Sequence, residues 1–263
     1  MMNFGGFIGE NNKAIAFTLG VLIFGAAVYL TLAPGQEMPA GGVDAGFFEG
    51  MRLKVGFAPD GSMKLFASAK NNALSKLSAA EGNSVPEGGA MVIGYAEASA
   101  MRGEKLFSKP GDSIKGFFGI RNISVEGVLR KTGSPVDEMH FLDANAFDAI
   151  EGEEGRAFVK VTPGGEPKLF YKLGYTDELL KKIRLAEGSV AGYETHVLGA
   201  TAYYPVFFGA AEAKLMRAEG KFADAGDTIE GFFGKNVVVA GVLEQTNASL
   251  DIMNFIPFNE KEL

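Results

Sequence analysis

The stretch GDSIKGFFG occupies residues 111–119, and GDTIEGFFG occupies residues 226–234. The two stretches differ only where Ser113 and Lys115 give way to Thr228 and Glu230. An aspartate stands where a helix N-cap belongs, apolar residues follow at the i, i+3, i+4 spacing of one helical face, and a glycine comes last. We therefore expect residues 113–118 and 228–233 to be short helices that plug a core. The plug residues are Asp112, Ile114, Phe117 and Phe118, and then Asp227, Ile229, Phe232 and Phe233.

The similarity continues on both sides of these stretches. Residues 52–66 (RLKVGFAPDGSMKLF) align with 156–170 (RAFVKVTPGGEPKLF), and residues 127–141 (GVLRKTGSPVDEMHF) align with 241–255 (GVLEQTNASLDIMNF). The matches keep their order along the chain, and the offset between them changes only at expected loops. This pattern indicates a tandem duplication. It predicts two compact β-rich domains, residues 50–143 and 155–258, joined by an acidic linker at 144–154.

The sequence of each copy predicts a mixture of strands and short helices. In the first copy we expect strands at 52–58, 63–69, 90–98, 121–131 and 136–142, with an extra helix around Leu74 and Leu77. In the second copy the last three strands fall at 196–202, 236–245 and 250–256. The predicted fold class is mainly β or α+β, with each copy a small OB-like β-barrel closed by its plug helix. An open α+β sandwich is the alternative.

Residues 14–32 (AIAFTLGVLIFGAAVYLTL) are uncharged and mostly apolar. A helix of that length spans roughly 28 Å, close to the ~30 Å hydrocarbon core of a bilayer. A buried helix and a cleaved signal peptide are the alternatives, but the run is long for both. Lys13 precedes the run and acidic residues follow it, which favours a cytoplasmic N-terminus. The sequence thus predicts a single-pass protein of the cell membrane, with residues 1–13 cytoplasmic, 33–49 a stalk, and the bulk extracytoplasmic.

Composition excludes several classes of function. The net charge is −7, and the two copies hold 12 Lys/Arg against 10 Asp/Glu and 11 against 12, so neither carries the basic surface that nucleic acids require. The chain has no cysteine, which removes disulfides, thiolate catalysis and cysteine-ligated metals.

The two histidines, His140 and His196, do not suggest a metal site. They are not equivalent between copies, since His140 aligns with Asn254, and no metal-binding spacing surrounds them. Met139 beside His140 hints at copper, but adjacent strand residues point to opposite faces. We expect Met139 in the core and His140 on the surface. No nucleophile or acid–base motif is present, so we expect no catalytic residues, no metal and no cofactor.

The copies differ most between residues 196 and 217. The second copy has about ten additional residues there, around TAYYPVFFG (201–209). Tyr203, Tyr204, Phe207 and Phe208 are candidates for an aromatic loop that contacts a partner. The alternative is a longer hairpin whose aromatic side chains fold back onto the core.

Together these features predict a membrane-anchored, non-catalytic binding or scaffolding module. Its partners would be the lipid bilayer, through residues 14–32, and proteins of a membrane or envelope complex. The alternative function is an envelope carrier of a small ligand, metal or haem with OB-like domains.

Overall fold

A computed structural model describes residue 43 and residues 45–59, 61–68, 70–174 and 177–257. The predicted cytoplasmic segment 1–13 and the membrane segment 14–32 lie outside this part of the chain. Within it, no helix is both long enough and apolar enough to span a bilayer.

The first half begins with a 3-10 turn and contains mainly strands. In order, its elements are η1 (Ala45–Phe48), β1 (Arg52–Phe57), β2 (Met63–Ser68), α2 (Asn71–Leu74), β3 (Ala79–Gly82), β4 (Met91–Ile93), α3 (Tyr95–Gly103), β5 (Ser113–Phe117), β6 (Ile120–Leu129), η2 (Pro135–Glu138), β7 (Met139–Leu142), α4 (Ala144–Ala149) and β8 (Glu153–Glu154).

The second half repeats the order from β1 to β7, with η3 and β12 added before the strand that corresponds to β4. Its elements are β9 (Ala157–Val161), β10 (Pro167–Leu173), α5 (Glu178–Lys182), β11 (Leu185–Gly188), η3 (Val190–Gly192), β12 (His196–Leu198), β13 (Thr201–Phe208), α6 (Ala210–Ala218), β14 (Thr228–Phe232), β15 (Lys235–Leu243), η4 (Ser249–Ile252) and β16 (Met253–Pro257).

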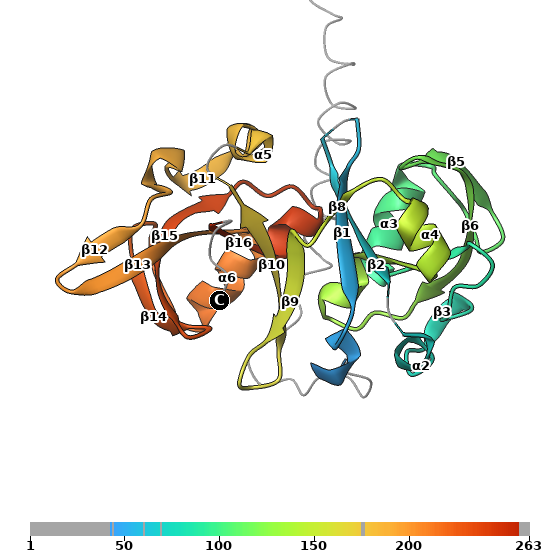
Figure 1. Ribbon diagram of the computed structural model, residues 1–263, viewed down its shortest axis with the longest axis horizontal. Coiled ribbons are helices and arrows are strands. Elements are labelled where there is room, and N and C mark those ends of the chain that lie inside the picture. The colour runs from blue at the N-terminus through green and yellow to red at the C-terminus, as the bar shows by residue number, and fades with distance from the viewer. Residues whose placement is uncertain (1–42, 44, 60, 69, 175–176, 258–263) are drawn as a thin grey trace, which may run out of the picture. The chain divides into compact units, whose positions relative to one another are not determined.

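Each half builds one mixed sheet (Figure 1). The first has the order β3-β6-β4-β7-β2-β1-β8, with β5 also on β6, and the second has β11-β15-β13-β16-β10-β9, with β14 on β15. The central pairs β2/β7 and β10/β16 are both parallel, and so are β4/β6 and β13/β15. The protein is therefore mainly β with few helices. Neither sheet closes on itself, so the predicted barrel is wrong and the open alternative describes the sheets better.

The two faces of each sheet belong to different apolar clusters. In β2, Met63 and Leu65 point to one cluster, whereas Phe66 points to another, as alternation along a strand requires. We call the first the shared cluster, because it contains buried residues of both halves, among them Leu65, Phe141, Leu169, Phe207 and Phe255. The opposite face of the first sheet packs on α3, and that of the second sheet packs on α6.

The repeated stretches are hairpins, which corrects the predicted plug helices. Residues 113–117 and 228–232 are the strands β5 and β14, paired with β6 and β15. Gly116 and Gly231 have φ of 65° and 68°, and the register of β14 shifts across Gly231. Such a bulge adds one residue to the strand, so two inward side chains stand three apart instead of two. This spacing mimics one face of a helix.

The second phenylalanine of each repeated stretch lies in the tight turn that follows the strand. Phe118 and Gly119 have φ of 46° and 82°, and Phe233 and Gly234 have 49° and 84°. Positive φ at both central residues is the signature of the type I′ hairpin turn. At this turn position the ring of Phe118 contacts Phe66, with 4.9 Å between the ring centroids.

The other predicted plug residues have roles in this hairpin. Ile114, Phe117, Ile229 and Phe232 are buried against α3 or α6, as expected of core residues. Asp112 does not cap a following helix. Its carboxylate accepts hydrogen bonds from the backbone N–H groups of Ser108 and Lys109, at 2.8 and 3.1 Å, which lowers its pKa. Asp227 accepts in the same way from Asp224 and Ala223.

The predicted strand at 90–98 is also wrong beyond residue 93. The chain leaves β4 at Gly94 and enters α3, and Gly209 occupies the same place before α6. A Cβ atom at Gly94 would lie 2.1 Å from the carbonyl oxygen of Val136, and one at Gly209 would lie 2.1 Å from that of Leu250. Only glycine lets the strand-to-helix corner approach the 3-10 turn this closely.

The acidic segment 144–154 is a helix and a strand packed on β1. Lys54 donates from Nζ to the carbonyl oxygens of Phe147 and Ile150, at 2.8 and 3.2 Å, and so satisfies the end of α4. Arg52 forms ion pairs with Asp148 and Glu154. The segment is therefore attached to the first sheet.

Candidate functional site

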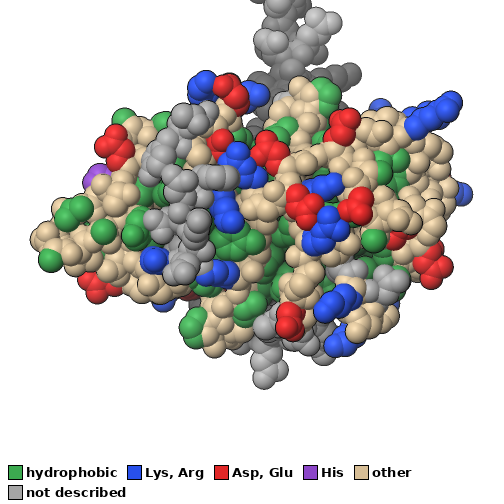
Figure 2. Space-filling model, in the orientation of Figure 1, with side chains coloured by type: hydrophobic (Ala, Val, Ile, Leu, Met, Phe, Trp, Pro, Cys, Tyr) green, Lys and Arg blue, Asp and Glu red, His purple; other side chains and the backbone are tan. Residues whose placement is uncertain are grey.

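The residues that distinguish the second half form a projecting hairpin. In β12 and β13, His196 pairs with Tyr203, Val197 with Ala202, and Leu198 with Thr201. Gly199, with φ of 65°, and Ala200 make the turn between the strands. Figure 1 shows this hairpin extending from the second sheet, and Figure 2 shows hydrophobic side chains over the same end. The corresponding β4 of the first half has only three residues.

The tip of the hairpin is the most exposed aliphatic surface in the described residues. Val197 is 68% exposed and Leu198 is 56% exposed. Because neighbouring strand residues point to opposite faces, neither face of the tip is covered. Leu198 borders a hollow of about 360 Å³ that His196, Gly226, Thr228 and Val239 also line.

The aromatic candidates lie in β13 itself, not in a loop. Phe207 and Phe208 are fully buried, on opposite faces of the sheet, and Tyr203 is 8% exposed. Tyr204 is half-buried, with the ammonium of Lys235 lying 5.7 Å from its ring centroid. The strand carries Tyr203, Phe207 and Phe208 into the core before the chain reaches α6, and leaves Tyr204 at its edge.

A second feature, unexpected from the sequence, is a buried ion pair in each half. Lys64 on β2 and Glu97 on α3 are joined at 2.7 Å, with side chains 7% and 3% exposed. Lys168 on β10 and Glu212 on α6 are joined at 3.1 Å, with side chains 9% and 6% exposed. The aligned copies place a lysine and a glutamate at equivalent positions, which is the signal that could have revealed the pairs. A lysine within an apolar strand was the second hint.

His140 joins the first of these clusters, which corrects its predicted place on the surface. It is fully buried, and its Nδ1 lies 3.1 Å from the carbonyl oxygen of Leu65. A carbonyl only accepts, so Nδ1 carries the proton and Nε2 is the acceptor. Nε2 lies 3.4 Å from Oε1 of Glu97 and 3.2 Å from the sulfur of Met101. Met139 points into the shared cluster instead, so the prediction of opposite faces is confirmed.

Burial changes the proton affinity of this cluster. It raises the pKa of Glu97 to about 7, against the attraction of Lys64. Burial and the charge of Lys64 together lower the pKa of His140 to about 3, so the imidazole is neutral in the folded protein. A proton on Glu97 would also join its carboxyl group to Nε2 of His140.

The second half has an equivalent buried polar cluster. Asn254 takes the place of His140 and donates from Nδ2 to the carbonyl oxygen of Leu169 at 3.0 Å. This leaves Oδ1 of Asn254 as a buried acceptor without a hydrogen-bond donor, whereas the ammonium of Lys168 lies 3.1 Å from Oε1 of Glu212 and donates to Oε2 at 3.3 Å. Burial raises the pKa of Glu212 as well. The two halves therefore keep one polar arrangement inside the face that packs on the helix.

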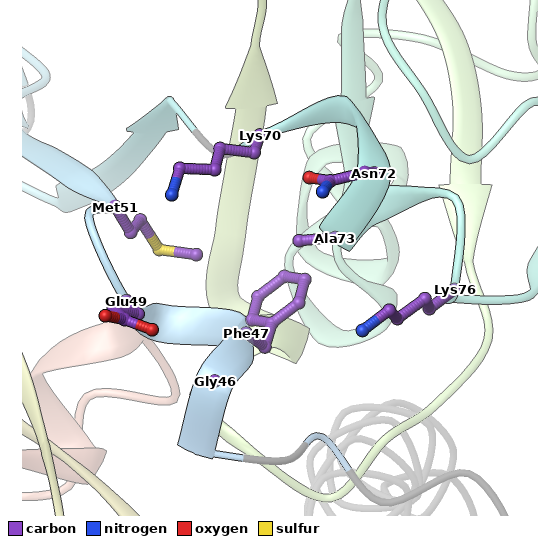
Figure 3. Close-up of a pocket in the computed structure, with 8 residues that line it drawn as sticks. All are labelled: Gly46, Phe47, Glu49, Met51, Lys70, Asn72, Ala73 and Lys76. Atoms are coloured by element: carbon purple, nitrogen blue, oxygen red, sulfur yellow. The ribbon is translucent and has the colours of Figure 1, made fainter.

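A small hollow of about 200 Å³ lies beside η1 (Figure 3). Phe47 and Met51 extend into it, and the ammonium groups of Lys70 and Lys76 lie at its edges. Among the described residues, no group of three or more His, Asp or Glu side chains is placed to hold a metal ion.

Replacing His140 with asparagine, the residue of the second half, should make the protein less sensitive to acid. The unfolded state binds a proton at His140 below pH 6.5, whereas the folded state does not until about pH 3, so acid favours unfolding. Between pH 7 and pH 5, wild type should lose about 2 kcal/mol of unfolding free energy relative to H140N. Urea unfolding at both pH values measures this. An equal difference between the two proteins at pH 7 and pH 5 would contradict a buried neutral imidazole.

The chain matches no protein-family model, no curated protein and no solved structure.

Proposed function

We propose that this chain is a single-pass membrane protein, anchored by residues 14–32, that presents two β-rich halves outside the cell membrane as a non-catalytic binding or scaffolding module. The observation that carries the binding role is the β12–β13 hairpin. The two halves share the order of six strands, and the second adds β12 on β13, a hairpin with aliphatic side chains uncovered on both faces. Uncovered apolar surface of this kind marks interaction sites.

The buried ion pairs favour a structural role for their charged residues over a catalytic one. Lys64, Glu97, Lys168 and Glu212 lie between a sheet and a helix, and each lysine pairs with the glutamate of the helix. They are placed to hold α3 and α6 on their sheets. Partners of the module would include the bilayer and proteins of a membrane or envelope complex.

Cysteine labelling tests the topology, because the chain has no cysteine of its own. Lys182 is exposed at the end of α5, and Asn3 lies before the predicted membrane segment. In intact cells whose membrane surface is accessible, a membrane-impermeant maleimide should label K182C. It should label N3C only after the membrane is permeabilised. Labelling of K182C only after permeabilisation would overturn the orientation.

A pull-down of the full chain in mild detergent, followed by mass spectrometry, tests binding to proteins. Wild type is compared with the double variant V197S/L198S, which should fold normally because both side chains are exposed. Proteins that wild type retains and the variant loses would identify the hairpin as a protein-binding element.

The hollow beside β12 favours a second candidate, an envelope carrier of a small ligand or haem. His196, a residue type that ligates haem iron, lines this hollow. Addition of haem to the purified protein should then produce a Soret band shifted from that of free haem, and H196A should abolish the shift. An unshifted band would exclude haem as the cargo.

A further inference from the structure

We propose that the tip of the β12–β13 hairpin inserts into the interfacial layer of the lipid bilayer that anchors the chain. Val197 and Leu198 are the inserting side chains. The inference rests on the proposed function, because residues 14–32 must hold the module at a membrane. The hairpin would then make a second, peripheral contact with the same membrane.

The exposure of the tip on both faces favours a lipid environment. Val197 and Leu198 point to opposite sides of β12, and both are more than half exposed. A flat protein surface would cover only one of these sides. A layer of acyl chains and headgroups surrounds an inserted tip on all sides, so it covers both.

The hairpin also lacks the charges that would oppose insertion. No Asp, Glu, Lys or Arg occurs between Glu194 and Glu212, a stretch that includes the whole hairpin. The three register pairs of β12 with β13 satisfy the inner backbone groups. The outer edge of β12 still needs water or headgroups as hydrogen-bond partners, which limits insertion to the interfacial layer.

The base of the hairpin has side chains typical of a membrane interface. Tyr204 is half-buried, and Lys235 lies over its ring. Tyrosine and lysine commonly lie at the headgroup level, where a ring and a charge both find favourable surroundings.

The length of chain between anchor and module keeps the module close to the bilayer. Residues 33–42 connect the predicted membrane segment to the first described residue, and ten residues reach at most about 35 Å. A domain of this size has a radius of gyration of roughly 17 Å. The module therefore cannot move far from the surface, and this proximity gives a weak contact a high effective concentration.

Tryptophan fluorescence tests the proposal directly, because the chain has no tryptophan. Full-length V197W, L198W, L215W and F24W are each reconstituted into phosphatidylcholine vesicles. The lipids are brominated either near the headgroup (acyl carbons 6 and 7) or deeper (carbons 11 and 12). Leu215 is a matched control, since it is a 45% exposed aliphatic residue on α6. Phe24 reports on the anchor.

Shallow bromines should quench V197W and L198W at least threefold more than L215W, and both emission maxima should shift to the blue. Deep bromines should quench F24W most strongly. If V197W and L198W behave like L215W while F24W is quenched, the anchor stands and the inserted hairpin is wrong. Quenching of only one tip residue would also overturn it, because the tip would then lie flat. If F24W escapes the deep bromines, the anchor fails and this inference fails with it.

Discussion

Replacing Glu97 with glutamine should lower the free energy of unfolding by about 3–5 kcal/mol, because it leaves a buried ammonium without its counter-ion. Lys64 is 7% exposed, and its remaining acidic neighbour, Glu104, lies 3.6 Å away at the surface. The measurement belongs at pH 8, above the pKa of about 7 that burial gives Glu97. Urea unfolding of wild type and E97Q gives the difference.

Two matched variants separate the buried charge from the loss of a side chain. The double variant K64M/E97L removes both charges and should recover most of the stability, to within about 1 kcal/mol of wild type. E81Q breaks the pair of Glu81 with Arg102, whose side chains are 42% and 32% exposed, and should cost less than about 1 kcal/mol. If E97Q costs no more than E81Q, the ion pair does not hold α3 on the sheet.

Replacing Phe208 with alanine should cost about 3–5 kcal/mol, since it opens a cavity in the second half. Phe208 is fully buried, stacks on Phe222 with 5.3 Å between ring centroids, and meets Phe232 edge-on at 5.7 Å. Thermal unfolding of the full chain measures the loss.

The control for this prediction lies four residues earlier in the same strand. Tyr204 is half-buried, so Y204A should cost only about 1 kcal/mol. Equal effects of Y204A and F208A would mean that the end of β13 is not in the core. A small effect of both would favour the aromatic loop expected from composition alone.

Local patterns predicted the parts of the fold that depend on neighbours in sequence. The strands expected at 52–58 and 63–69 correspond to β1 and β2, and the helix around Leu74 exists, although it is short. The spacing of Ile229 and Phe232 suggested a helix because the bulge between them in β14 produces the same three-residue interval as one helical face. Residues 90–98 were predicted as one strand because a three-residue strand and a helix follow one another there without a polar break.

The candidate site depended on contacts between distant residues, which local patterns do not contain. His140 is buried because Leu65 and Glu97, 75 and 43 residues away, supply its polar neighbours. The additional residues of the second half were visible as a failed alignment. The alignment did not show which of these residues would be exposed. The sheet buries Phe207 and Phe208 and leaves Val197 and Leu198 exposed.

The shared cluster has a consequence for how the chain is made. Its surface on the first sheet, including Leu65 and Phe141, is covered by residues such as Leu169 and Phe255 that are synthesised about a hundred residues later. At a translation rate of 5–20 residues per second, this face of the first half stays uncovered for roughly 5–20 s. During that interval the nascent chain exposes an aliphatic and aromatic sheet face. This face must therefore be protected until the second half emerges, and a ribosome that stalls between the halves would release an aggregation-prone fragment.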